Sequence, residues 1–385
     1  MPYAQGRTYF DADSHIMELP DFLRDFADPA LRERLPDLSF ASGGRSAKGV
    51  QEAAARGAQP PERVDEMVAL GDGLIAGPKG YAALGAFNRE ERTQALDQLG
   101  FQKQLVFSTF SAGFCFYGAL SPEDRYGAAR AHNRAMAHFC AADARLLGVG
   151  ALPLDDPARA ASELDALLEM GLAAAWIPHG ANGGRSPGHD DFDAIWARLA
   201  EARVPFVLHV GGQPLQLHPD WMNTGRPIPT DWLGGGENVR SKDMTSLHHP
   251  VETFLGAMIL DGVLERFPEL RGGAIELGAG WVPSMTKRLD WSAEIWRKSE
   301  PELARLTRRP SEQIAEQLAF TPYPYEDVGD LIDQSSADLF LFSSDYPHFE
   351  GGRNPLGRFE QTLGARGEDA RNRFYAENFT RVFGD

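Results

Sequence analysis

Length, composition and charge narrow the classes of protein that this sequence can encode. The chain has 385 residues, 43% of them hydrophobic, and a formal net charge of −17. An acidic chain is repelled by nucleic acid and by anionic membrane surfaces, so neither is expected as a partner. The two cysteines cannot form a disulfide framework, and the sequence has neither a signal-like N-terminal run nor a stretch of about 18 apolar residues. We therefore expect a cytoplasmic protein that forms a single domain over residues 1–385.

Short apolar runs recur along the chain and are separated by helical patterns. The runs predict strands at 8–12, 103–108, 146–153, 172–177, 204–210, 270–277, 318–321 and 338–343. Helices are predicted between them at 122–143, 157–170, 190–203, 251–267, 281–298, 311–316, 325–334 and 355–363, and a last helix at 367–383 is expected on the exterior. Eight strands that alternate with helices favour a closed α/β barrel, the (β/α)8 or TIM barrel, over an open sheet.

Two segments do not fit this alternation. Residues 38–92 are rich in Gly, Ala and charged side chains, and we interpret them as a long insertion after the first strand. Residues 211–247 follow the fifth strand and are rich in Pro, Gly and Trp; a loop of this length is either a functional lid or disordered. The anchors Trp221, Met222 and Trp232 favour an ordered lid, in which Trp221 and Trp232 would contact the substrate.

Unusual polar residues lie at the ends of the predicted strands. Asp13 and His15 follow the first strand, His209 ends the fifth, and Asp345 follows the eighth. Barrel enzymes build their sites at the carboxyl ends of strands, where imidazole and carboxylate groups bind Zn²⁺, Fe²⁺ or Mn²⁺. Asp13 and His15 are two residues apart in an extended strand, so they point to the same side. These four residues predict a divalent metal site, whereas a capping Asp13 and a packed His15 would not explain the matching strand ends.

Several motifs stand in order along the chain: DADSH followed by MELP, VLHVGG, GVLERFPELR, SSDYPH and the closing AENFTRVF. As an ordered set they resemble the amidohydrolase-related family of the amidohydrolase superfamily, which includes aminocarboxymuconate-semialdehyde decarboxylase and γ-resorcylate decarboxylase. The resemblance covers nearly the whole chain apart from the two inserted segments, and it implies a distorted (β/α)8 barrel with a divalent metal. By position, Asp13 and His15 match the family's first-strand pair, His209 its strand-five ligand, and Asp345 the strand-eight aspartate, which often binds metal and handles protons.

One position departs from that family pattern. The family's decarboxylases have a histidine at the end of strand six, where this chain has Glu276. A carboxylate there can act as a general base if its pKa is raised, or it can become a further metal ligand. The structural alternative is an ion pair with Arg271 or Arg288, because a Glu between apolar strand residues needs a partner.

Four histidines outside the predicted metal set are candidate members of the site. His249 follows the lid-like segment and is predicted to face the pocket as a catalytic group, while the adjacent His248 is expected to point elsewhere. His348 comes three residues after Asp345 and is expected to hold that side chain in place. His179, after the fourth strand, is a weaker candidate.

The favoured functional class is a metal-dependent hydrolase or a non-oxidative decarboxylase (a lyase). Its small substrate would carry a carboxylate or carbonyl group, in some cases on an aromatic ring. One metal ion would polarise that group, and Asp345 or Glu276 would move the proton. Arg226 or Arg240 would hold a substrate carboxylate. The family resemblance also favours a homodimer or a larger homo-oligomer.

A second class stays open because the candidate ligands outnumber those that one ion needs. Three carboxylates and three imidazoles suit two Fe or Mn ions, and the six residues are Asp13, Glu276, Asp345, His15, His209 and His249. The corresponding enzyme would be a dinuclear non-heme iron oxygenase that hydroxylates a small organic substrate. A barrel that binds a ligand without metal is a third, non-enzymatic interpretation, which the intact set of strand-end residues disfavours.

Overall fold

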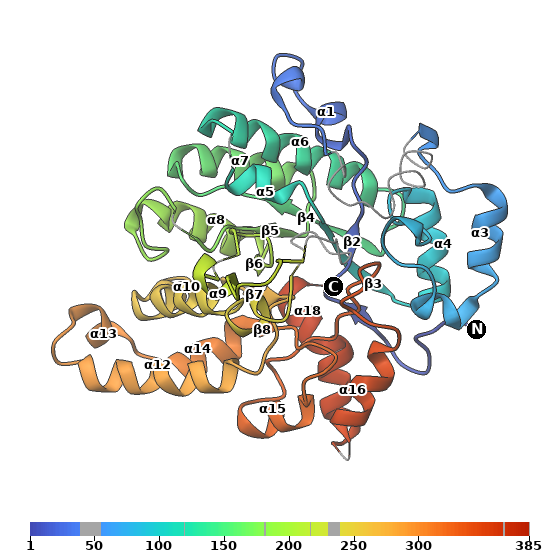
Figure 1. The fold of residues 1–385 in the computed structure, drawn as a ribbon. Coiled ribbons are helices and arrows are strands. Elements are labelled where there is room, and N and C mark those ends of the chain that lie inside the picture. The colour runs from blue at the N-terminus through green and yellow to red at the C-terminus, as the bar shows by residue number, and fades with distance from the viewer. Residues whose placement is uncertain are drawn as a thin grey trace.

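A curled parallel sheet forms the centre of the protein, and helices surround it (Figure 1). The structure, a computed structural model, describes residues 1–38, 55–118, 120–180, 182–215, 217–229, 239–364 and 366–384. The strand order is β1-β3-β4-β5-β6-β7-β8, and β2 pairs with β3. The strands are β1 (Phe10–Asp11), β2 (His15–Ile16), β3 (Lys103–Ser108), β4 (Leu146–Ala151), β5 (Ala174–Trp176), β6 (Phe206–His209), β7 (Gly272–Ile275) and β8 (Leu318–Phe320).

The sheet closes through the segment predicted as the eighth strand, 338–343. Phe340 forms a parallel bridge with Phe320 of β8, and the Ala12 amide donates to the Phe342 carbonyl at 3.0 Å. These bonds join the last strand to the first, although the segment pairs too irregularly to count as a strand. Of the predicted first strand, 8–12, only Phe10–Asp11 forms a strand, β1, and β2 follows beyond the predicted range at His15–Ile16. The fold is therefore the distorted (β/α)8 barrel that the sequence predicts.

The helices predicted between the strands are present, with ends that differ by a few residues. The predicted helix at 251–267 is divided, because Gly262 adopts a positive φ of 77° after α10. None of the helices in the described ranges is long and apolar enough to span a membrane. The helices are α1 (Phe22–Phe26), α3 (Pro61–Val68), α4 (Arg89–Leu99), α5 (Ala112–Phe116), α6 (Pro122–Cys140), α7 (Pro157–Glu169), α8 (Asp193–Ala202), α9 (Pro219–Met222), α10 (His249–Leu260), α11 (Val263–Arg266), α12 (Val282–Trp296), α13 (Pro301–Arg305), α14 (Pro310–Gln317), α15 (Val328–Gln334), α16 (Pro355–Leu363), α17 (Glu368–Asn372) and α18 (Asn378–Phe383).

Part of the segment interpreted as an insertion supplies the first helix of the barrel. Helix α4 begins after Asn88, whose side chain accepts a hydrogen bond from the Glu91 amide, and it ends at Gly100 with φ 78°. An Asn cap and a left-handed Gly are ordinary signals for the two ends of a helix. The insertion proper is thus shorter than 38–92, and its residues 39–54 lie outside the described part of the chain.

The last helix packs against the inside of the barrel, not on its exterior as the sequence analysis expected. Phe379, Val382 and Phe383 of α18 belong to the same buried cluster as strand residues such as Leu105 and Val207. In Figure 1, α18 lies at the centre of the ring of elements. Phe374 and Tyr375, earlier in the predicted helix, pack instead in the other buried cluster with Phe359 of α16, so only the end of that helix lies inside the barrel.

Candidate metal centre

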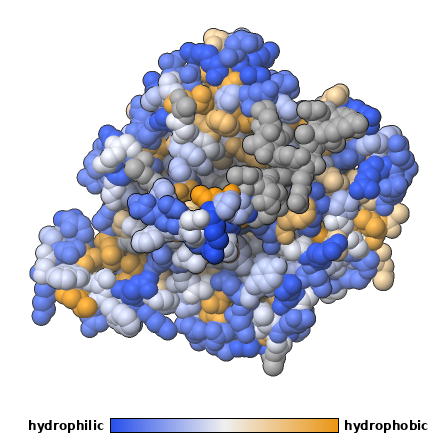
Figure 2. All heavy atoms as spheres, viewed as in Figure 1, coloured by the Kyte–Doolittle hydropathy of each residue, from blue (hydrophilic) through white to orange (hydrophobic). Residues whose placement is uncertain are grey.

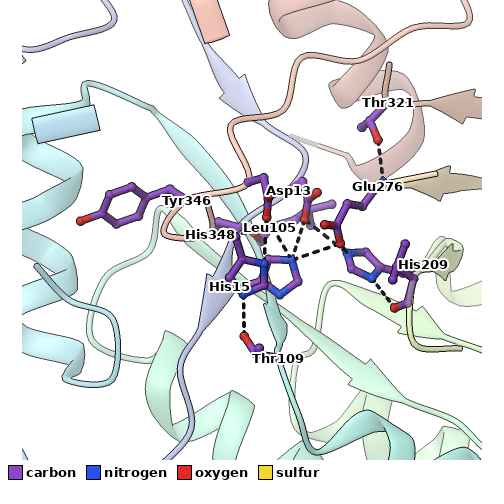
Figure 3. Close-up of polar contacts among 12 residues, drawn as sticks. Asp13, His15, Leu105, Thr109, His209, Glu276, Thr321, Tyr346 and His348 are labelled. Carbon is purple, nitrogen blue, oxygen red and sulfur yellow. Dashed lines mark hydrogen bonds and ion pairs between the residues drawn. The ribbon is translucent and has the colours of Figure 1, made fainter. Parts of the chain in front are cut away.

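Six side chains from separate parts of the sequence converge at the carboxyl ends of the strands (Figure 3). The ligand atoms of Asp13, His15, His209 and Glu276 all lie within 4.8 Å of one another. A second group with the same spacing is made of His15, Glu276, Asp345 and His348. The structure therefore brings together Asp13, His15, His209, Glu276 and Asp345, but not His249, the sixth ligand considered for a two-ion site.

Backbone carbonyls determine which nitrogen of each imidazole faces the cluster. Nδ1 of His15 lies 3.2 Å from the Ser108 carbonyl, and Nδ1 of His209 lies 2.7 Å from the Val210 carbonyl. A carbonyl oxygen only accepts, so in both rings Nδ1 carries the hydrogen. The Nε2 atoms of His15 and His209 consequently present lone pairs to the cluster, as metal-binding imidazoles do.

The atoms that face one another at the centre of the cluster are all acceptors. Nε2 of His15 lies 3.3 Å from Asp13 Oδ1, 3.5 Å from Asp345 Oδ1 and 3.7 Å from Glu276 Oε2. Nε2 of His209 lies 3.4 Å from Asp13 Oδ1 and 3.3 Å from Glu276 Oε2. Buried lone pairs and carboxylates repel one another at these distances unless a cation lies between them. The donor set, two imidazoles with several carboxylates, suits Zn²⁺, Mn²⁺ or Fe²⁺.

The two oxygens of Asp345 are buried and have no hydrogen-bond partner. Burial, and next the nearby Asp13 carboxylate, raise the pKa of Asp345 to about 7. Burial, and next the imidazole of His348, lower the pKa of His15 to about 4, so that ring stays neutral at physiological pH. A divalent cation at the cluster would lower the pKa of Asp345 again, because positive charge favours the ionised carboxylate.

His348 lies beside Asp345, and the orientation of its ring depends on Thr109. The Thr109 hydroxyl donates to the Ile16 carbonyl at 2.6 Å and lies 2.9 Å from Nε2 of His348. Because the single hydroxyl hydrogen of Thr109 is donated to the Ile16 carbonyl, the hydroxyl oxygen accepts a hydrogen bond from Nε2–H of His348. Nδ1 of His348 therefore presents a lone pair to Asp345 Oδ1, 3.1 Å away.

Two of the clustered carboxylates stand on strained backbone. The backbone angle φ is 57° at Glu276 and 51° at Asp345, and residues other than Gly seldom adopt such positive values. Such conformations cost about 1–3 kcal/mol each and are held by surrounding bonds. Here the Glu276 amide donates to Thr321 Oγ1 at 2.8 Å, and the Asp345 amide donates to the Asp13 carbonyl at 2.9 Å. The left-handed turn aims each carboxylate into the barrel mouth.

A buried network that the sequence analysis did not predict lies behind the cluster. Asp11 accepts from the Ser344 amide at 2.7 Å, the Ser344 hydroxyl at 2.6 Å and the Gln104 side chain at 2.7 Å. Arg92 donates to Gln104 at 3.1 Å and also to the His15 carbonyl. The network thus ties the chain around His15 to the segment that carries Asp345. The first aspartate of the DADSH motif was the only sequence signal for it.

A cavity of about 600 Å³ opens beside the cluster. Its walls include the aromatic side chains of Trp281, Tyr323, Tyr325 and Phe349. Figure 2 shows a small group of hydrophobic side chains near the centre of this face, bordered by hydrophilic ones. A ligand pocket of this size with few polar groups suits a small, mostly apolar molecule.

The two neighbouring histidines occupy the opposite positions from those expected. His248 lines the large cavity, where its ring stacks on Trp281 with centroids 5.8 Å apart. His249 lines a separate cavity of about 270 Å³ between α10 and α12. The turn before α10 rotates the side chains of consecutive residues apart, so the choice between them could not be made from the sequence.

The lid-like segment contributes to the cavity through other residues than those predicted. Val239, Met244 and Leu247 line it. Of the predicted substrate contacts, Trp221 is 67% exposed and Arg226 is exposed, while Arg240 is half-buried; none of the three is among the residues that line the cavity. The fourth, Trp232, lies outside the described residues.

The ion pairs considered for Glu276 are not formed. Arg288 pairs with Glu252, and Arg271 donates to the carbonyls of Pro268 and Leu270. Glu276 lies instead beside Nε2 of both His15 and His209. The carboxylate therefore belongs to the cluster, as the metal-ligand alternative expected.

Three titratable residues near the site, one buried and two half-buried, had no strong signal in the sequence. Nζ of Lys79 is buried without a hydrogen-bond partner, and burial lowers the pKa of Lys79 to about 8. Burial, with His209 second, lowers the pKa of His179 to about 3. Glu350, five residues after Asp345, lines both the large cavity and a smaller one at the cluster. Its place in the loop that carries Asp345 was the one available signal.

The fold and the cluster together define a class: barrel enzymes with imidazole and carboxylate groups at the carboxyl ends of the strands. Comparison with known proteins gives the family. The family model for amidohydrolases matches residues 87–384, and the chain belongs to this family of enzymes.

Individual relatives are distant. The decarboxylase orsB of Emericella nidulans is 25% identical over 226 residues, which cover 57% of this chain and 64% of that protein. The match thus spans less than two thirds of the relative's length. An amidohydrolase from Mycobacterium avium subsp. paratuberculosis, map2389c, has a TM-score of 0.72 at 21% identity, with 99% of this chain and 100% of that chain covered. A dihydroxybenzoic acid decarboxylase from Polaromonas sp. was solved with manganese and the inhibitor 2-nitroresorcinol. It has a TM-score of 0.60 at 20% identity, and the match covers 98% of this chain and 97% of that chain. These two structures support the fold.

Proposed function

We propose that the protein is a divalent-metal-dependent decarboxylase of small aromatic carboxylates. The observation that carries this proposal is the set of buried acceptor atoms at the mouth of an aromatic-walled cavity. The acceptors repel one another unless a cation binds between them, and the cavity beside them has aromatic, apolar walls. The names of two relatives, a decarboxylase and a dihydroxybenzoic acid decarboxylase, support the reaction type.

We propose Asp13, His15, His209 and Asp345 as the residues that hold one cation. Glu276 lies 3.3 Å from Nε2 of His209 and is close enough to join them. Manganese is the first metal to test, because the relative from Polaromonas sp. holds it; zinc and iron suit the same ligands. When bound, such a cation polarises a carboxylate or carbonyl oxygen of the substrate.

Asp345 is the residue that we propose to move the proton. Its carboxyl is buried, and it lines the small cavity at the cluster together with Glu276. A carboxylic acid there would give its proton to the ring carbon that bears the carboxylate. The bond between that carbon and the carboxylate then breaks, its electron pair returns to the ring, and CO2 leaves. His348, at 3.1 Å, holds Asp345 in position.

The test uses the manganese-loaded protein with 2,6-dihydroxybenzoate under argon, with CO2 and resorcinol measured. We expect turnover by the wild type, a metal content near one per chain, and a loss of at least about 100-fold in Asp345→Asn. Asp220, which is 81% exposed, provides the control Asp220→Asn with unchanged turnover. A fully loaded wild type that releases no CO2 from any mono- or dihydroxybenzoate would show that the proposal is wrong.

A second candidate function is a dinuclear oxygenase. The observation that favours it is the second group of close ligand atoms, His15, Glu276, Asp345 and His348, which shares His15 and Glu276 with the first. Carboxylates bridge two ions readily, and two-metal sites have ions about 3.5–4 Å apart. Glu276→Gln separates the candidates: it should halve a metal content near two, but leave a content near one unchanged. Two irons per chain and no turnover without O2 would favour the oxygenase.

We also propose that the protein is a homodimer or a larger homo-oligomer, in one domain, in the cytoplasm. Three large apolar side chains on α12 are exposed: Trp291 at 60%, Ile295 at 67% and Trp296 at 53%. Exposed apolar groups that gather on one helix are typical of association surfaces. Sedimentation velocity of the wild type and of Trp291→Ser tests the assembly, since a monomeric wild type would contradict it. The free, buried Cys115 and Cys140 fit a reducing compartment.

A further inference from the structure

Glu350 is a half-buried residue beside the cluster, and the proposed reaction does not use its carboxyl. We propose that Glu350 is a specificity-determining residue, which accepts a hydrogen bond from a hydroxyl group of the aromatic substrate. The substrate would then be a planar ring with one anionic group and at least one hydroxyl donor. This inference rests on the proposed function and makes its substrate class more specific.

The position of Glu350 places it on the path of a ligand. The large cavity and the small cavity that contains Asp13 and Asp345 have Tyr323 and two carboxyl side chains, Glu276 and Glu350, in their walls in common. A molecule that fills the large cavity and reaches toward Asp345 therefore passes between these two carboxyls. Because Glu276 already contacts the imidazoles of the cluster, Glu350 is the one that remains for the substrate.

The hydrogen bonds of the cavity carboxyls distinguish Glu350 from its neighbour Glu326. Glu326 accepts from the amides of Ala279, Gly280 and Tyr323 at 2.6–3.2 Å, so it holds the cavity wall together. Oε2 of Glu350 is buried and has no hydrogen-bond partner. A buried acceptor without a partner is destabilising unless a ligand or water completes it. The geometry thus leaves Glu350 available to a donor on a bound molecule.

The charges around the cavity indicate what kind of molecule that is. Its described lining residues include Glu276, Glu326, Glu350 and His248, but no lysine or arginine. A second carboxylate on the substrate would have no cation to pair with there and would be repelled by the glutamates. Hydroxyl groups, in contrast, donate to a carboxyl oxygen.

The shape of the walls indicates a planar ring. Trp281 and Phe349 contribute aromatic surface to the cavity. The hydroxyl of Tyr323 donates to the Glu276 carbonyl at 2.9 Å, so this residue also presents its ring to the cavity, with its polar end already bonded. Aromatic walls of this kind pack best against the face or edge of another ring.

Lys79 offers an alternative partner for Glu350 that the experiment must separate. Its buried Nζ also lacks a hydrogen-bond partner and lies 5.6 Å from the centre of the Tyr346 ring. The ion pairs found among the described residues do not include one between Lys79 and Glu350. If Glu350 served only to neutralise Lys79, Lys79→Met would change ligand binding in the same way as a Glu350 variant.

The experiment measures binding to the manganese-loaded protein by calorimetry with two matched probes. One is 2-nitroresorcinol, which has two hydroxyl donors; the other is 1,3-difluoro-2-nitrobenzene, in which fluorine replaces both hydroxyls. We expect Glu350→Leu to weaken binding of 2-nitroresorcinol at least about tenfold and to leave the difluoro compound unchanged. Glu350→Gln, which keeps an acceptor oxygen, should lose less than Glu350→Leu. Glu294→Leu, on the exposed side of α12, is the control for loss of a carboxyl.

Four results would overturn the inference. Equal weakening of both probes in Glu350→Leu, or no change in either at full metal content, would show that Glu350 does not contact the hydroxyl. The same selective loss in Lys79→Met would assign the effect to charge neutralisation. Failure of the loaded wild type to bind either probe would contradict the proposed substrate class itself, which is a different outcome from binding that ignores Glu350.

Discussion

Nδ1 of His348 and Oδ1 of Asp345 face each other as two acceptors 3.1 Å apart. Thr109 accepts from the other ring nitrogen of His348, so the lone pair on Nδ1 cannot turn away without the loss of that bond. Two buried acceptors at this distance need a proton or a cation between them. The pair therefore links the protonation of Asp345 to the charge held at the cluster.

The first prediction tests this link through Thr109, which we interpret as a positioning residue. Thr109→Val removes the acceptor for Nε2–H of His348 with little change in side-chain volume. We expect turnover to fall about 10- to 100-fold while the metal content is retained, as is usual when a group behind a ligand is removed. Thr93→Val is the matched control, because the Thr93 hydroxyl bonds only within α4. The inference about His348 would be wrong if Thr109→Val kept full activity and an unchanged pH profile of kcat.

The second prediction concerns His209, whose Nε2 lies among the carboxylates of Asp13 and Glu276. His209→Ala should lower the metal content to a small fraction of one and reduce turnover by more than about 100-fold, because a direct ligand matters more than its support. Far-ultraviolet circular dichroism should stay the same. The control is His138→Ala on α6, whose ring contacts Arg89 away from the cluster. Normal metal content in His209→Ala would remove this residue from the site.

The third prediction is that metal binding stabilises the fold. Without a cation the clustered acceptors repel one another, so the folded state gains free energy when one binds. A manganese concentration 100 times the dissociation constant should add about 2.7 kcal/mol to the free energy of unfolding. We expect chelator-treated wild type to show a rise in Tm on addition of Mn²⁺, and His209→Ala to show little change. A Tm for the wild type that is the same with and without metal would contradict the proposed site.

The fourth prediction concerns the pH dependence of stability at His132, a buried residue of α6 whose Nε2 lies 3.0 Å from Oγ of Ser108. Burial lowers the pKa of His132 to about 4, whereas an exposed histidine has about 6.5. As the pH falls below about 6.5, the unfolded chain takes up this proton and the folded chain does not. Stability is therefore complete above about pH 6.5 and decreases toward pH 4, by up to about 1.4 kcal/mol per pH unit.

Urea unfolding at pH 7, 6 and 5 checks this prediction by comparison of the wild type with His132→Gln. The wild type should lose stability more steeply with acid than the variant, although the variant is less stable at pH 7. The comparison isolates one imidazole, because the other buried histidines are common to both proteins. Parallel pH profiles for the two proteins would contradict the prediction, because they would show that His132 has the same pKa in the folded and the unfolded chain.

The sequence by itself was enough to predict the barrel and the residues that meet at its mouth. Strand periodicity located Asp13, His15, His209 and Glu276 at strand ends, and parallel strands bring such ends together. Asp345 could be predicted in the same way, although the segment before it closes the barrel with only a few regular bonds. The direction of the Glu276 and Asp345 side chains, however, follows from the left-handed backbone at these two residues, which no strand period predicts.

The tertiary structure alone decided which loop side chains join the site. His248 and His249 are adjacent, and only the turn before α10 selects the first for the cavity. Thr109 meets His348 across 239 residues of sequence, a contact that no local pattern signals. In loops the backbone angles follow from packing between distant segments and not from a repeating period, so the direction of a side chain is a property of the folded chain as a whole.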